Sequence, residues 1–128
     1  MQKRMRFFLL GLGCLFSATV LSNPSYQFSS NQTSDFVLAP QTPTEFVNVF
    51  VWTINAVCTM VTELDTVPLS FKVIKRTGSL DGNPLSAGDQ MDVTVHPMDV
   101  VRISASPGAR VELTNHSTKD IIARCYTT

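Results

Sequence analysis

Short runs in which apolar and polar side chains alternate are the feature that most constrains this fold. The clearest are Trp52–Met60, with apolar side chains or cysteine at every second position, and Leu69–Val73. Successive side chains of a β-strand point to opposite faces of the sheet, so a period of two indicates strands with one buried face. Apolar positions of a helix recur every three to four residues, and no long stretch shows that spacing. The sequence therefore predicts an all-β fold.

Turn-forming residues separate these strands at a regular spacing. The remaining runs are 91–95, 101–105, 111–113, 121–125, 36–38 and 46–51. Phe36–Leu38 is an expected edge strand, because Pro40 and Pro43 follow it, and the dense apolar run Phe46–Val51 is an expected strand buried on both faces. Strands that recur about every 8–12 residues are typical of a sandwich or barrel. We expect a small antiparallel β-sandwich, immunoglobulin-like or a related Greek key, with about seven to eight strands.

Residues 1–22 have the pattern of a secretory signal peptide. Three basic residues among the first six precede the apolar run Phe7–Leu21, and a polar stretch begins at Asn23. The run is shorter than the roughly 20 residues of a transmembrane helix. Cleavage ahead of Asn23 would leave an exported protein, periplasmic or secreted, without a transmembrane anchor. Lipid attachment at Cys14 is an alternative, but Gly11 stands where an aliphatic residue is expected.

The exported part is expected to be one domain with an acidic balance. Residues 23–35 are polar and lack apolar periodicity, so we expect a flexible leader there and the sandwich in 36–128. Loss of residues 1–22 leaves seven basic and ten acidic side chains, a net charge of −3. Nucleic acids and anionic membrane surfaces are bound largely through clustered positive charge, so this balance argues against both.

The cysteine count predicts one disulfide. Without Cys14 the chain keeps Cys58 and Cys125, and each lies on the apolar face of its predicted strand. An even number of cysteines in an exported protein favours pairing. A Cys58–Cys125 bond would join an early strand to the last one, and chain-entropy models assign such a long loop on the order of 4 kcal/mol.

Four aspartates in the turns form a candidate cation site. Calcium binds several oxygen ligands supplied by loops, and the segment Asp81–Asp99 is rich in them. The candidate ligands are Asp81, Asp89, Asp92 and Asp99. Asp-Gly and Gly-Asp pairs are also ordinary hairpin chemistry, so we expect turns here rather than a calcium site. The spacing of His96, His116 and the two cysteines fits neither zinc nor blue copper, so we expect no other metal and no cofactor.

Catalytic patterns are not evident in the sequence, and we expect a protein that is not an enzyme. There is no Gly-x-Ser-x-Gly motif, and both exported cysteines are assigned to a bridge. Phe46, Phe50 and Trp52 share one face of a predicted strand beside Cys58, which indicates core rather than a binding row. Tyr26 and Phe28 lie in the expected leader.

Two families share part of this pattern, and the chain is identified as a member of neither. It resembles immunoglobulin-like domains in linking an early and a late strand, but Trp52 precedes Cys58, whereas the usual tryptophan lies between the cysteines. It resembles chaperone–usher pilins in export and in the C-terminal aromatic Tyr126. The pilin disulfide, however, is confined to the N-terminal half.

The expected function is binding of a macromolecule, protein or glycan, by an exported sandwich. Such scaffolds present loops and edge strands on a rigid body. A bacterial secreted, virulence-type factor is one form of this function, since the basic N-terminus is typical of bacterial signals. The first alternative is a cation- or carbohydrate-binding module that uses the Asp81–Asp99 loops. The second is a small hydrolase whose residues are distant in sequence.

The signal peptide leads to a direct prediction. Intact-mass analysis of the exported protein should give a chain that starts near Asn23 and has no lipid, because signal peptidase removes the preceding segment. Retention of Met1, or a diacylated Cys14, would contradict it.

Overall fold

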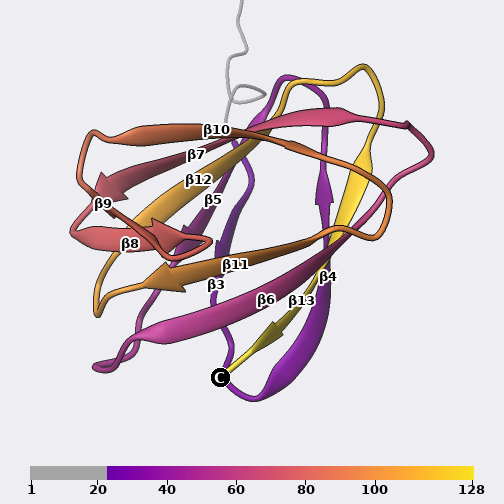
Figure 1. The fold of residues 1–128 in the computed structure, drawn as a ribbon. Coiled ribbons are helices and arrows are strands. Elements are labelled where there is room, and N and C mark those ends of the chain that lie inside the picture. Colours follow the sequence, from indigo (N-terminus) through magenta and orange to yellow (C-terminus); the bar gives the residue numbers. More distant parts are fainter. Residues whose placement is uncertain (1–22) are drawn as a thin grey trace, which may run out of the picture.

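The computed structural model describes residues 23–128, which form eleven strands in two sheets packed face to face (Figure 1). The signal-peptide expectation for residues 1–22, with Cys14, lies outside the described residues. The strands are β3 (Ser25–Gln27), β4 (Gln32–Leu38), β5 (Pro43–Val47), β6 (Ile54–Val61), β7 (Val67–Lys75), β8 (Thr77–Leu80), β9 (Asn83–Ser86), β10 (Gln90–Val95), β11 (Val100–Ala105), β12 (Arg110–Asn115) and β13 (Ile121–Thr127). Within these residues there is no helix, so the all-β prediction is confirmed.

The strand order is that of a jelly roll. One sheet has the order β10-β7-β12-β5-β3 and the other the order β4-β13-β6-β11-β8-β9. Without β3, β8 and β9, the eight remaining strands, numbered along the chain, have the orders 5-4-7-2 and 1-8-3-6. This is the arrangement produced by two Greek keys. Of the two expected forms, the sandwich is therefore the related Greek key, and seven of its eight principal strands contain all or most of a run recognised in the sequence, while β5 overlaps only the start of the run 46–51.

The alternating pattern places one face of each strand in a common core. In β6 the side chains of Ile54, Ala56, Cys58 and Met60 are buried, while Asn55 between them is exposed. The same phase holds in the other principal strands, whose buried residues include Leu69, Phe71, Val73, Val101, Ile103, Val111, Leu113, Ile121 and Ala123. All strand pairs of the eight-stranded framework are antiparallel. Their register places the buried residues of neighbouring strands on the same face of the sheet.

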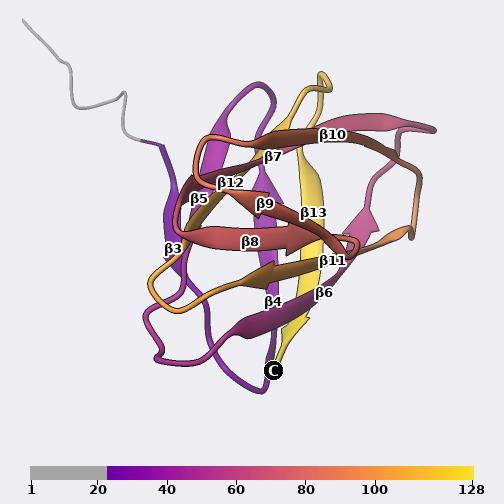
Figure 2. The same ribbon diagram turned by 60° about the vertical axis from the view of Figure 1, so that its left-hand side comes forward.

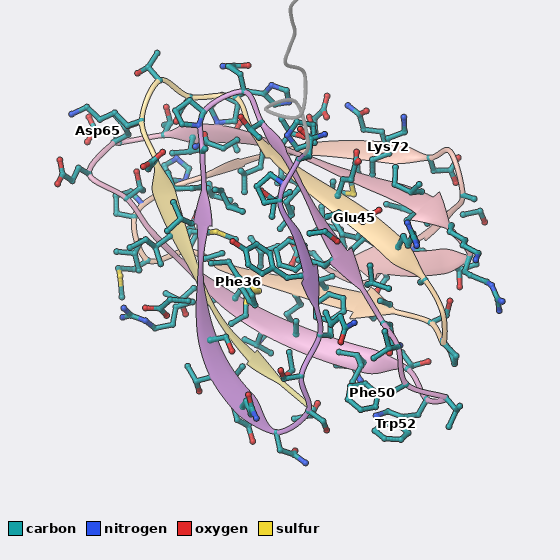
Figure 3. All side chains as sticks on the ribbon, turned by 180° about the vertical axis from the view of Figure 1, so that it is seen from behind. Phe36, Glu45, Phe50, Trp52, Asp65 and Lys72 are labelled. Atoms are coloured by element: carbon teal, nitrogen blue, oxygen red, sulfur yellow. A yellow bond between two sulfur atoms is a disulfide. The ribbon has the colours of Figure 1, made fainter. Side chains whose placement is uncertain are left out.

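The expected flexible leader is instead part of the sandwich. Residues 25–27 form β3, which pairs in parallel with β5, and β4 begins at Gln32. Phe28 is buried, and its ring stacks on Phe46 at 5.6 Å between centroids. Tyr26 and Phe36 complete an aromatic cluster around Phe46 (Figure 3). Composition alone missed this segment because two aromatic rings, spaced by one residue, anchor an otherwise polar stretch.

The expected edge strand is confirmed, whereas the dense apolar run is not a strand. β4 contains Phe36–Leu38 and lies at the edge of the six-stranded sheet. β5 ends at Val47, and the following residues up to Thr53 form a loop. Phe46 alone of the three expected core aromatics is fully buried; Phe50 is partly buried and Trp52 is exposed. The expectation that all three share a strand face was therefore wrong.

One hairpin escaped sequence prediction. β8 and β9 turn at Asp81-Gly82, where both residues have positive φ, as a two-residue type I′ turn requires. Each strand has four residues and a polar composition, and Leu80 is the fully buried side chain. At Gly78 a Cβ atom would lie 2.7 Å from the Ser104 carbonyl, so glycine permits β8 to pair closely with β11. The hairpin extends the six-stranded sheet beyond β11 (Figure 2).

The predicted disulfide is present and links adjacent strands. Cys58 and Cys125 are directly opposite one another in the β6–β13 pairing, and both side chains are buried. β13 lies between β4 and β6 (Figure 2), so the bond fixes β13 as the second strand from the β4 edge of the six-stranded sheet. In immunoglobulin domains, by contrast, the conserved bond joins the two sheets.

Removal of this bond should lower the free energy of unfolding substantially. We expect the Cys58→Ser/Cys125→Ser double variant to lose about 2–5 kcal/mol, because the unfolded chain regains the freedom of a long loop. Urea denaturation of the oxidised wild type and the double variant measures the difference. Equal denaturation midpoints would contradict this assignment of stability.

Candidate functional site

The loop between β5 and β6 contains four consecutive apolar side chains, of which three are exposed and Phe50 is partly buried. Val49, Phe50, Val51 and Trp52 make up this segment, hereafter the Val49–Trp52 loop. Val51 is 87% exposed, Val49 53% and Trp52 48%. The rings of Phe50 and Trp52 stack with their centroids 4.6 Å apart, and Figure 3 shows them side by side at the periphery of the molecule. Contiguous exposed apolar side chains on a small domain mark an interaction surface.

A buried asparagine holds this loop in place. The Asn48 side chain is fully buried, and its Nδ2 donates to the carbonyls of Trp52 at 2.8 Å, Ala105 at 2.9 Å and Ser106 at 3.1 Å. Its Oδ1 accepts from the Phe50 amide at 2.9 Å. These side-chain hydrogen bonds take the place of backbone strand pairing in the loop. For this reason the alternation of buried and exposed side chains that begins at Ile54 does not extend back through Trp52. The loop is therefore tied to the β11–β12 turn.

Basic side chains stand beside the loop. A hollow of about 420 Å³ is lined by Val49–Val51 and also by Lys75, Arg76 and Arg110. We call these three cations the basic rim. Arg110 Nη1 lies 3.5 Å from Glu45 Oε2, an exposed ion pair. The hollow thus combines apolar side chains with positive charge.

The four aspartates of the candidate cation site are engaged separately, each with local partners. Asp81 Oδ1 accepts from the Arg102 amide at 2.8 Å, and Asp89 Oδ2 accepts from the Ser86 amide at 2.9 Å. Asp99 Oδ2 accepts from the His96 amide at 2.8 Å. This bond and the His96 ring hold the pKa of Asp99 below its usual range. Among the described residues no group of three or more His, Cys, Asp or Glu side chains could hold a metal ion.

Asp92 belongs to a polar cluster that the sequence did not indicate. Ser70 Oγ donates to Asp92 Oδ1 at 2.8 Å and lies 2.6 Å from His116 Nε2. Hydrogen bonds from Gln90 and Ser70 lower the pKa of Asp92. The cluster lines a hollow of about 410 Å³ on the outer face of the five-stranded sheet. The register of three strands assembles it, so no local motif could have revealed it.

The geometry of this cluster differs from that of a catalytic triad. In a triad the histidine lies between serine and aspartate and accepts the serine proton. Here Ser70 lies between Asp92 and His116. A hydroxyl has one proton, and the carboxylate can only accept, so His116 Nε2 is the donor to Ser70. The serine proton is thus directed to the carboxylate and not to the histidine, as it would be in a triad.

Comparisons with protein-family models, characterised proteins and solved structures found no significant match. The search of residues 23–128 for a long apolar helix that could cross a membrane also found none. The functional argument therefore depends on the surface geometry described above.

The Asn48 network yields a stability prediction. Asn48→Ala should lower the free energy of unfolding by about 1–3 kcal/mol, because buried carbonyls lose their donor. It should also accelerate hydrogen exchange in residues 49–53. Asn55→Ala, at an exposed side chain of β6, is the matched control. Urea denaturation and exchange mass spectrometry measure both effects, and identical behaviour of the two variants would contradict the role of Asn48.

Proposed function

We propose that the protein is an exported, non-enzymatic β-sandwich that acts by binding a larger partner through the Val49–Trp52 loop. The single observation behind this proposal is that three of four successive apolar side chains are exposed and the fourth, Phe50, is partly buried, while a buried amide fixes their backbone. A disulfide-closed fold is consistent with an oxidising compartment outside the cytoplasm.

The loop has the properties of a preorganised binding element. Exposed aromatic side chains dominate the energetics of many interfaces, and tryptophan is strongly enriched among their central residues. Ordering a mobile loop opposes binding, so a loop held by Asn48 loses less conformational entropy when it engages a partner. Exposed valines beside Trp52 extend the apolar surface without adding flexible side chains.

The alternatives have weaker support. A cation site would need carboxylates that converge, whereas Asp81, Asp89 and Asp99 each accept a backbone hydrogen bond in a separate turn. A hydrolase of the triad type would need a serine that can transfer its proton to a histidine, and Ser70 donates to Asp92 instead.

Site-specific photo-crosslinking tests the proposal. A benzoylphenylalanine replacing Val51 should give adducts with envelope or host-cell fractions, resolved as protein, glycan or lipid by mass spectrometry. The same replacement at Met98, an exposed side chain of the β10–β11 turn, is the control. Excess unlabelled wild type should suppress the position-51 adducts, and excess Val51→Asp should not. Equal adducts at both positions, or none at position 51, would overturn the proposal.

A further inference from the structure

The end of the sandwich that carries the Val49–Trp52 loop concentrates the positive charge of the described chain. The basic rim contributes three of the seven Lys and Arg residues in 23–128. Among the described residues, neither Lys75 nor Arg76 forms an ion pair. Arg76 has a positive φ of 67°, and its guanidinium lies against Gly108 in the turn that also contacts Asn48. The fold itself therefore places these cations beside the apolar loop.

From this arrangement we infer that the Val49–Trp52 loop and the basic rim dock on the surface of an anionic phospholipid bilayer. The inference rests on the proposed function, in which this loop is the binding surface. It names a lipid surface as the partner in place of the protein or glycan expected from the sequence. Apolar side chains flanked by Lys and Arg are the arrangement with which peripheral proteins enter the boundary between headgroups and acyl chains.

The individual side chains favour a bilayer over a glycan. Val51, the most exposed residue of the loop, is a branched aliphatic side chain with no hydrogen-bonding group. Phe50 and Trp52 cover one face of each other's rings, which reduces the area available to stack on a sugar. Tryptophan is enriched at membrane interfaces, where its ring is buried and its N–H stays near the headgroups.

For docking on a bilayer, the positions of the charges matter more than the net charge of the protein. A net charge of −3 argued against an anionic surface. Electrostatic attraction to headgroups, however, falls off within a Debye length, about 10 Å at moderate ionic strength. Lys75 and Arg76 therefore act on the bilayer more strongly than acidic groups at the far end, whereas the charge of Arg110 is partly offset by Glu45. The β10–β11 turn with Asp99 is at that far end, because Val100 pairs with Thr59 while Ala105 pairs with Ile54.

Trp52 provides a direct test because it is the only tryptophan in the chain. The purified, oxidised protein is mixed with vesicles of phosphatidylcholine alone or of phosphatidylcholine with phosphatidylglycerol. With the anionic vesicles we expect a blue shift of Trp52 emission, quenching by brominated acyl chains, and co-sedimentation that weakens as salt is added. Phosphatidylcholine alone should give little response.

Variants separate the two parts of the surface. Lys75→Gln and Arg76→Gln should each weaken vesicle binding by roughly fivefold, since one cation near an anionic surface contributes about 1 kcal/mol. Val51→Asp should abolish the blue shift. Met98→Asp, at another exposed apolar position, and Lys119→Gln, at a cation outside the rim, should bind like wild type.

Several outcomes would overturn the inference. These are the absence of a Trp52 response to anionic vesicles, an equal response to phosphatidylcholine alone, and unchanged binding by Val51→Asp. Position-51 crosslinks to a protein or glycan without a vesicle response would reject the bilayer and leave the proposed function standing. Neither crosslinks nor a vesicle response would reject both.

Discussion

The position of β13 between β4 and β6 is the constraint on which the rest of the structure depends. Two backbone ladders and the Cys58–Cys125 bond fix it there. Since β11 and β12 are likewise inserted between earlier strands, neither sheet is complete until the C-terminal strands have paired. Such pairings between distant segments are slow to form because the loop entropy is lost first. The disulfide stabilises one of these long-range pairings, that of β6 with β13.

Buried amides connect this framework to its loops. Asn48 anchors the Val49–Trp52 loop to the β11–β12 turn. Asn115 does the same elsewhere, where its Nδ2 donates to the carbonyls of Leu38 and Lys119. An amide side chain offers two donors and an acceptor, so one residue can satisfy several backbone groups that no ladder reaches. Exposed apolar side chains can then be displayed on a fixed backbone, a combination suited to binding.

Local charge and total charge have different consequences in this molecule. The acidic side chains are spread over turns and the outer face of the five-stranded sheet, where several accept backbone hydrogen bonds. The basic rim gathers near the apolar loop because Lys75 ends β7, Arg76 follows it, and Arg110 begins β12. Total charge governs solubility, whereas the field at a docking surface depends on the nearest charges.

The sequence by itself determined the class of fold, the principal strands and the disulfide. Alternation in runs such as Leu69–Val73 reports which face of a strand is buried, and this property is local to the strand. The two cysteines left once Cys14 is set aside with the predicted signal peptide could pair in only one way. The hairpin β8–β9 and the strand β3 were missed because their stability comes from contacts with β11 and β5, not from their own composition.

Only the tertiary structure decided the candidate site. Phe50 and Trp52 continue an apolar pattern that in sequence is indistinguishable from a core strand. Their position in a loop, with Trp52 exposed and Phe50 partly buried, follows from Asn48, whose side-chain hydrogen bonds to carbonyls nearly sixty residues away replace the strand ladder. The basic rim and the Ser70–His116 contact are likewise assembled by strand register. Local patterns specify which face of a strand is buried, whereas proximity between distant side chains depends on how all the strands pair.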